Sequence, residues 1–277
     1  MKIKVMLDSS ADIPKELEVK ENLTVARFTI TVDGKEYIDE EELSLDKYKT
    51  FLNEGRDMST SQASIGLLMQ MWDEALKTHD EIIYITLSKS LSGSYSSAYA
   101  LSQEYNGRVT VLDTDAVAYP LYVIYEAVVN FVNEGKSIAE IKEIVELNEK
   151  MYAHIVPFDI NHLKKGGRIS SQAAALANLL KINPILSLDN GVIDAHDKVR
   201  TRKKAVLKAA EQLVEKYPNS DDYVWYLLHS DLEDEAEHYA EWFKEKGINI
   251  VVKQLYPLIL THTGPQTIAF GVYKKLK

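Results

Sequence analysis

The chain has 277 residues, which suits one large domain or two of ordinary size, and 45% of them are hydrophobic. Its formal net charge is −10, which argues against a nucleic-acid partner, because nucleic-acid surfaces need an excess of Lys and Arg. The absence of cysteine excludes disulfides, thiol nucleophiles and thiolate metal sites, and it fits a reducing cytoplasm.

Membrane-directed segments are not expected from the hydropathy pattern. The apolar run after Met1 is too short and too interrupted for a signal peptide, and no stretch reaches the ~18 consecutive apolar residues of a spanning helix. The best candidate, residues 121–132, carries Glu126 and Asn130. We therefore expect a cytoplasmic protein with no integral membrane segment.

Strands and helices are predicted in alternation along the first half of the chain. The predicted strands cover residues 2–7, 23–32 (ending in a turn at Asp33-Gly34), 81–87 and 108–112. The predicted helices cover residues 45–52, 65–76, 95–105, 122–133 and 138–150, the last opened by a capping box from Ser137 to Glu140.

The second half is predicted to begin with a strand over residues 153–156. There follow a basic turn at residues 164–168, a helix over 171–180, a hairpin of strands 184–188 and 192–198, a helix over 203–216, a strand over 223–228, a helix over 233–246 and a strand over 248–255. The tail is expected to end in a short helix. This alternation predicts two α/β domains with mostly parallel sheets, over residues 1–152 and 153–277.

Two hydroxyl-rich segments, residues 59–64 (STSQAS) and 88–94 (SKSLSGS), precede predicted helices. A helix N-terminus offers unpaired backbone N–H groups and partial positive charge, so it can bind an anion. Hydroxyl groups add donors without adding a counter-charge, and Gly93 lets the backbone approach a ligand closely. The alternative is ordinary N-capping by Ser and Thr. Both segments are predicted to lie where a parallel sheet forms its ligand crevice, so anion binding and ordinary N-capping both remain open interpretations.

A carboxylate is the anion that suits these segments better than a nucleotide phosphate. The chain has neither a G-x-G-x-x-G motif nor a phosphate loop, whereas a few hydroxyls and amides can satisfy a carboxylate. No metal site is expected, because H-E-x-x-H is absent and the Glu235/His238 pair has no second copy. No cofactor is expected either.

Two further polar segments carry alternative interpretations. His262 lies between Thr261 and Thr263 and can either donate to a carboxylate or anchor a turn. The basic residues up to Arg168 form either a solvated loop or a contact to an anion or partner. A stand-alone serine-dependent hydrolase, using Ser64 or Ser92 with His262, is the alternative function, although residues 62–66 match only half of a G-x-S-x-G elbow.

Taken together, the motifs resemble one family, the DegV-like fatty-acid-binding proteins, which include binding subunits of bacterial fatty acid kinases. The resemblance covers nearly the whole chain, and the matching motifs are, in family order, residues 8–14 (DSSADIP), 60–62 (TSQ), 91–95 (LSGSY), 163–170 (LKKGGRIS), 180–186 (LKINPIL), 198–201 (KVRT) and 262–265 (HTGP). Ala63 stands where the family usually has proline, and residues 113–120 lack the small and glycine residues common there.

The resemblance implies a protein that is not itself an enzyme. It would bury one long-chain fatty acid between two α/β domains and present it to a separate kinase for acyl-phosphate formation, in phospholipid metabolism. Thr60 and Ser92 match the positions that bind the carboxyl group, and His262 and Arg168 match a supporting polar network. The expected ligand-binding residues are therefore Thr60, Ser61, Ser92, Gly93, Arg168, His262 and Thr263.

Overall fold

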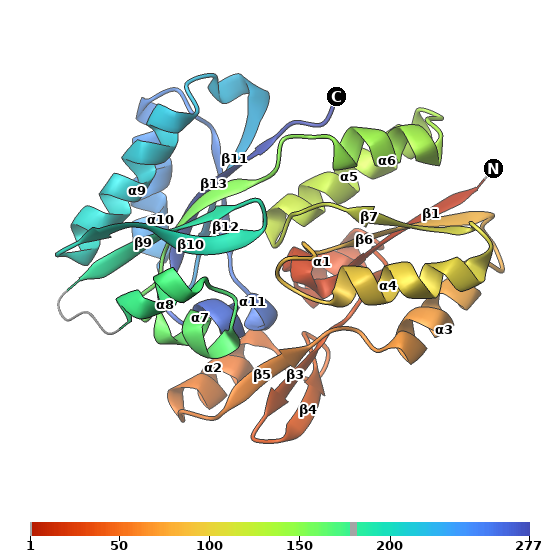
Figure 1. Ribbon diagram of the computed structural model, residues 1–277, viewed down its shortest axis with the longest axis horizontal. Helices are drawn as coiled ribbons and strands as arrows, with labels where there is room; N and C mark the ends of the chain where they lie inside the picture. The colour runs from red at the N-terminus through yellow and green to blue at the C-terminus, as the bar shows by residue number, and fades with distance from the viewer. Residues whose placement is uncertain (1, 178–181) are drawn as a thin grey trace. The chain divides into compact units, whose positions relative to one another are not determined.

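The computed structural model describes residues 2–177 and 182–277. The chain divides into two compact units: unit 1 is Met1–Asn148 with Leu276–Lys277, and unit 2 is Glu149–Lys275 (Figure 1). Residues 149–152, which the sequence analysis assigned to the first domain, lie in unit 2, where β8 (Tyr152–Val156) joins the sheet.

The main sheet of unit 1 is parallel throughout, as the sequence predicted. Its strands, in spatial order, are β2 (Val25–Ala26), β1 (Ile3–Asp8), β6 (Glu81–Thr86) and β7 (Val109–Asp113). Because the strands are parallel, the carboxyl ends of β1, β6 and β7 meet at one edge, where doubly wound sheets usually bind ligands.

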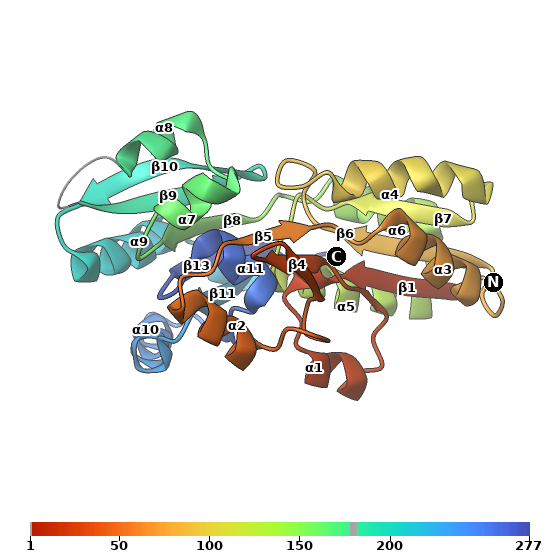
Figure 2. The same ribbon diagram turned by 90° about the horizontal axis from the view of Figure 1, so that it is seen from below.

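Helices cover both faces of this parallel sheet. The helices of unit 1 are α1 (Lys15–Lys20), α2 (Leu45–Asn53), α3 (Ile65–Ala75), α4 (Ser94–Ser102), α5 (Tyr119–Asn133) and α6 (Ile138–Glu146), with 3-10 turns η1 (Ser9–Ala11) and η2 (Gln103–Tyr105). α4 packs with α3 and α5 packs with α6, and α4 and α5 lie on opposite faces (Figures 1 and 2). The predicted capping box of α6 is confirmed.

A second, three-stranded antiparallel sheet corrects the single strand predicted over residues 23–32. Its strands, in spatial order, are β4 (Lys35–Ile38), β3 (Thr29–Val32) and β5 (Met58–Ser61). The predicted strand breaks between β2 and β3, because the Phe28 amide donates to the Ser9 hydroxyl (2.9 Å) and the buried Arg27 pairs with Glu18 (2.5 Å). The predicted turn is confirmed, since Asp33 and Gly34 both have positive φ.

Unit 2 contains a six-stranded sheet in which the β11–β12 pair is parallel and every other adjacent pair is antiparallel. Its strands, in spatial order, are β10 (Val192–Val199), β9 (Asn183–Asp189), β8, β13 (Ile268–Lys274), β11 (Tyr223–His229) and β12 (Ile250–Gln254). The α/β class is therefore confirmed, but the mostly parallel arrangement holds only for the main sheet of unit 1. The reason is that β13 lies between β8 and β11 and runs antiparallel to both. The confirmed β9–β10 hairpin then adds two further antiparallel strands beside β8.

The end of the chain differs most from the sequence prediction. The predicted terminal helix is instead β13, an apolar and almost fully buried central strand. Residues Thr261–Thr263 form the end of a helix, α11 (Pro257–Thr263). The basic segment is likewise not a turn, since Lys164 and Lys165 lie in the last turn of α7 (Asn161–Gly166).

The remaining helices of unit 2 are α8 (Ser171–Leu176), α9 (Arg202–Lys216) and α10 (Glu233–Glu245), with a 3-10 turn η3 (Ser220–Asp222). The helix predicted over residues 171–180 thus begins as expected, and its residues 178–180 lie outside the described part. Apolar side chains of α9 and α10 pack against the sheet and form the core of this unit, with Leu213, Phe243 and Phe270 fully buried.

Candidate functional site

Ser92 lies in the loop between β6 and α4, at the carboxyl edge of the parallel sheet. Its hydroxyl oxygen accepts a hydrogen bond from the Ser94 amide (3.1 Å), and Ser88 accepts similarly from the Ser90 amide (3.2 Å). Gly93, the N-cap of α4, makes no side-chain cap hydrogen bond. Because a serine hydroxyl has one hydrogen besides its two lone pairs, Ser92 keeps its hydrogen for an acceptor such as a carboxylate.

Thr60 and Ser61 do not lie at a helix start, which corrects the interpretation of residues 59–64. Both belong to strand β5, where Thr60 pairs with Ile30 of β3 and Ser61 pairs with Thr29. The helix cap is Ser64, whose hydroxyl accepts from the Leu67 amide (3.1 Å). Since successive side chains of a strand point to opposite faces, Thr60 and Ser61 cannot both direct their hydroxyls to one ligand. Thr60 is half-buried and Ser61 is exposed.

Gln62 holds the two hydroxyl-rich segments beside each other. Its side-chain amide donates to the Ser97 hydroxyl of α4 (2.8 Å), and a Cβ at Gly93 would lie 3.5 Å from Gln62 Oε1. A Cβ at residue 93 would make only ordinary van der Waals contact, so the segments lie side by side without requiring glycine there. The segments carrying Thr60 and Ser92 thus meet in unit 1.

Asp8 is a polar residue of this edge that the sequence analysis noted only as part of a motif. Its carboxyl group is fully buried at the end of β1 and accepts from the Ser10 amide (2.9 Å), the Ser10 hydroxyl and the Thr86 hydroxyl. Burial raises the pKa of Asp8 to about 6, although these hydrogen bonds oppose the shift. A sequence signal existed, because an acidic residue directly after a buried strand needs partners.

In unit 2, the imidazole of His262 packs directly on α7. A Cβ at Gly166 would lie 2.5 Å from His262 Nδ1, and a Cβ at Gly264 would lie 2.5 Å from Cδ2 of His162. His262 of α11 thus packs against Gly166 of α7, and His162 of α7 packs against Gly264, the C-cap of α11, so the two helices fit together closely. The structure therefore brings together the two motifs, residues 163–170 and 262–265, that the sequence separates by almost a hundred positions.

His262, Thr263 and Arg168 differ in how they are held. Burial lowers the pKa of His262 to about 4, with a smaller contribution from the positive charge of Arg168, so the ring is neutral at neutral pH. The Arg168 guanidinium donates to the carbonyl of Gly166. The Thr263 hydroxyl donates to the Ile259 carbonyl one turn back (3.2 Å), so it can only accept from a further partner.

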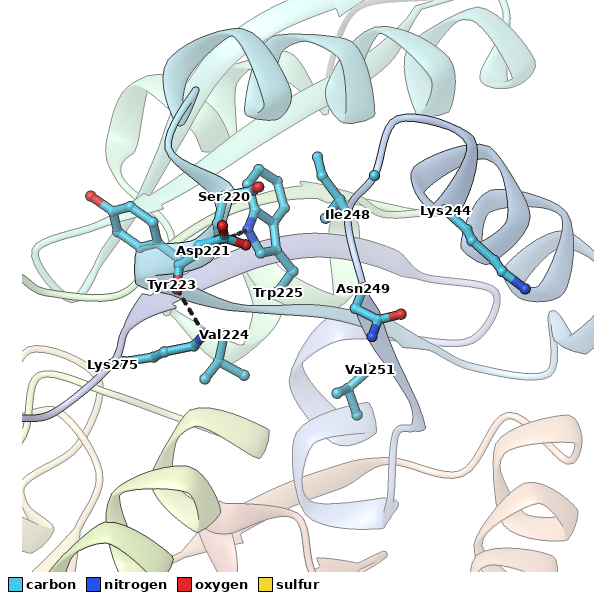
Figure 3. A pocket seen from close by; sticks show the side chains of 11 residues that line it. Ser220, Asp221, Tyr223, Val224, Trp225, Lys244, Ile248, Asn249, Val251 and Lys275 are labelled. Carbon is cyan, nitrogen blue, oxygen red and sulfur yellow. Dashed lines mark hydrogen bonds between the residues drawn. The ribbon is translucent and has the colours of Figure 1, made fainter.

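A hollow of about 490 Å³ on unit 2 is lined by none of the candidate residues (Figure 3). It is lined by residues of η3, β11, β12 and the end of α10, including Trp225 and Lys244, and by Lys275, which follows β13. The Trp225 indole donates to the Ser220 carbonyl (3.0 Å) and Lys275 donates to the Asp221 carbonyl (2.7 Å), so these groups have partners within the protein.

Among residues 2–177 and 182–277, no group of three or more His, Asp or Glu side chains is placed to hold a metal ion. No helix there is both long and apolar enough to cross a membrane.

Comparisons with known proteins agree over almost the full length. A family model described as "Uncharacterised protein, DegV family" matches residues 2–275. The chain is 30% identical over 274 residues to a DegV domain-containing protein of Staphylococcus aureus strain N315, covering 98% of each. It is 32% identical over 281 residues to a DegV domain-containing protein of Clostridium perfringens, covering 97% of this chain and 96% of the relative.

Solved structures show the same similarity in three dimensions. A DegV family protein from Thermus thermophilus, described for its fatty acid binding, matches with a TM-score of 0.88 and 28% identity over 99% of this chain and 100% of that one. A fatty acid binding DegV family protein from Streptococcus agalactiae matches with a TM-score of 0.89 and 29% identity over 99% of both chains. DegV from Bacillus subtilis, described as a fatty acid binding protein, has a TM-score of 0.86 and 28% identity, covering 99% and 100%.

Proposed function

Because this chain belongs to the DegV family, we propose that it binds one long-chain fatty acid and is not itself an enzyme. The observation that carries the proposal is the full-length similarity to the structures of three bacterial DegV family proteins, each of which is described as binding fatty acid. The arrangement of Ser92, which keeps a hydroxyl hydrogen for an acceptor, supports a carboxylate as the recognised group.

In this proposal, Thr60 and Ser92 donate hydrogen bonds to the carboxylate, and Ser61 and Gly93 contribute backbone beside them. A hydrogen bond to a charged group contributes about 1.5–3 kcal/mol, and the free-energy cost of burying a carboxylate without such partners would be prohibitive. The family resemblance assigns Arg168, His262 and Thr263 to the same head group. Neutral His262 can donate one N–H, and Arg168 supplies the compensating positive charge.

The acyl chain supplies most of the binding free energy. At ~0.8 kcal/mol per buried methylene, a sixteen-carbon chain contributes roughly 12 kcal/mol before costs. Association costs on the order of 4–15 kcal/mol, so tight binding requires a tunnel that is largely formed before the ligand arrives. We propose that apolar residues near 155–158 and 179–186 take part in lining it; residues 179–181 lie outside the described part.

We further propose that a separate fatty acid kinase phosphorylates the bound acyl group, for use in phospholipid metabolism in the cytoplasm. The chain has no phosphate loop, so the kinase must bring the ATP. No nucleic-acid partner and no cofactor are part of the proposal. Cations near the head group, such as Lys164 and Lys165 beside Arg168, could attract an acidic kinase surface or neutralise the acyl-phosphate product.

Mass spectrometry of the natively purified and then denatured protein tests the binding proposal. We expect fatty acid from the expression host in an amount close to that of the protein, and a rise in melting temperature when delipidated protein is reloaded. Repeated extraction without fatty acid, together with an unchanged melting temperature on addition, contradicts the proposal. Ester hydrolysis that is lost in Ser92→Ala would instead favour the serine-hydrolase alternative.

A further inference from the structure

A buried carboxyl group lies at the base of the Ser92 loop. Asp8 is fully buried, and it accepts hydrogen bonds from the Ser10 amide (2.9 Å), from the Ser10 and Thr86 hydroxyls and from the backbone of Leu87. Burial raises the pKa of Tyr84, which lies on the neighbouring strand β6, and the charge of Asp8 raises it further. Several hydrogen-bond donors thus converge on one buried carboxyl group, at a position where an apolar side chain would need none.

The network continues from Asp8 to Ser92 without a gap. The Thr86 hydroxyl, which bonds to Asp8, lies 2.9 Å from the hydroxyl of Ser94, and the Ser94 amide donates to Ser92 Oγ (3.1 Å). Ser94 is buried and is the first residue of α4.

The direction of these hydrogen bonds follows from the charge of Asp8. An ionised carboxylate only accepts, so Thr86 must donate to it, and the Thr86 oxygen is then left to accept from the Ser94 hydroxyl. Hydrogen bonds to an ionised acceptor are about twice as strong as neutral ones. Asp8 thereby holds the side chain of Ser94 in place. Through that side chain it also holds the Ser94 amide, which orients the Ser92 hydroxyl.

We propose that Asp8 is a positioning residue for Ser92, acting through Thr86 and Ser94 at the start of α4. This inference rests on the proposed function, in which Ser92 donates to the carboxylate of the fatty acid. It goes further because Asp8 touches no ligand in this scheme. It identifies the buried end of β1 as the part of the fold that keeps the loop carrying Ser92 in its binding geometry.

A double-mutant cycle with Asp8→Asn and Ser92→Ala tests the inference, with fatty-acid affinity measured on delipidated protein by a fluorescent fatty acid. Asp8→Asn should weaken affinity about tenfold in the otherwise native chain and less than about twofold when residue 92 is already alanine. A general structural role gives the same factor in both backgrounds and overturns the inference. Native protein that binds no fatty acid, or Ser92→Ala with native affinity, instead overturns the proposed function.

Thr86 provides an independent test if Asp8→Asn does not fold. Thr86→Val removes the hydroxyl that links Asp8 to Ser94 at almost unchanged volume, whereas Thr86→Ser keeps it. We expect about tenfold weaker binding for the valine variant and native affinity, within about twofold, for the serine variant. The control is Asp73→Asn near the end of α3, where the exposed carboxylate accepts from the Tyr105 hydroxyl (3.0 Å) and should not affect affinity. Equal affinities for Thr86→Val and Thr86→Ser would overturn the inference.

Discussion

Gly166 lies directly against the imidazole of His262, so closely that a Cβ at residue 166 would be only 2.5 Å from Nδ1. His162 lies equally close to the position that a Cβ would take at Gly264. Two helices, α7 and α11, are therefore fitted together by a pair of glycine–histidine contacts. The orientation of His262 is set by the absence of a side chain at residue 166, and it should change when one is added.

Gly166→Ala should therefore displace the His262 ring. A contact of this kind forces neighbouring atoms to shift and costs roughly 1–3 kcal/mol of folding free energy. We also expect weaker fatty-acid binding, because His262 is proposed to serve the head group. Denaturant unfolding and binding of a fluorescent fatty acid measure the two effects.

Gly66→Ala is the matched control for this substitution. Gly66 lies in the first turn of α3, where a Cβ would meet nothing within 4 Å, so alanine should stabilise the helix slightly. If both variants retained native stability and affinity, the proposed positioning of His262 by Gly166 would be wrong.

Ser92→Ala and Thr60→Ala should weaken fatty-acid affinity more than they weaken the fold. Each removes a donor to a buried carboxylate, worth about 1.5–3 kcal/mol, or about ten- to a hundredfold in affinity. The control is Ser137→Ala, which removes the N-cap of α6 and should cost about 1 kcal/mol of stability with no change in affinity. Native affinity in the Ser92/Thr60 double variant would reduce both residues to structural roles.

The stability of the delipidated protein should fall as the pH is lowered from about 6.5 to 4, partly through His262. Its folded-state pKa is about 4, below the ordinary value of 6.5, so the unfolded chain binds a proton in this window and the folded chain does not. The buried His154 acts in the same direction, and Asp8, whose folded-state pKa is raised to about 6, acts in the opposite direction.

His262→Gln should therefore flatten the acid loss of stability, while Asp8→Asn should steepen it. Unfolding free energies measured at several pH values between 4 and 7 provide the comparison. A slope in His262→Gln identical to that of the native chain would contradict the assignment of a buried, neutral ring.

Ala118→Gly should stabilise the protein. Ala118 precedes α5 with φ +58° and ψ −143°, a backbone conformation that suits glycine, and its amide donates to the Ser10 carbonyl (2.8 Å). We expect the unfolding free energy to rise by about 1 kcal/mol, less the greater entropy of glycine in the unfolded chain. Ala116→Gly, a buried neighbour without positive φ, should destabilise; stabilisation by both or by neither would exclude the strain argument.

Arg168→Ala should impair kinase-dependent formation of acyl phosphate while leaving much of the fatty-acid affinity. The guanidinium is held by the Gly166 carbonyl beside His262, and in the proposed function it serves the head group and the kinase. A coupled assay with a kinase of the source organism, run beside direct binding, separates the two effects. The control is Lys208→Ala, a surface cation paired with Asp197 (2.6 Å). Unchanged turnover in Arg168→Ala would remove that residue from the docking proposal.

Local features of the fold were predictable from the sequence because short segments determine them. The cap at Ser137 follows from one hydroxyl at a helix start, and the turn of the β9–β10 hairpin at Asn190-Gly191 follows from two residues that tolerate positive φ. The parallel strand β6 was recognisable from its continuous apolar run. Membership of the DegV family was likewise predictable, because its motifs occur in order.

Only the tertiary structure decided the strand order of unit 2 and the surroundings of the candidate residues. An apolar stretch such as β13 does not encode which strands will pair with it, so a central antiparallel strand was mistaken for a terminal helix. Thr60 was assigned to a helix start because its hydroxyl pattern is the same in a strand. The contacts of Gly166 with His262, and of Asp8 with Thr86, join residues that are far apart in the chain, and such contacts depend on the packing of whole elements.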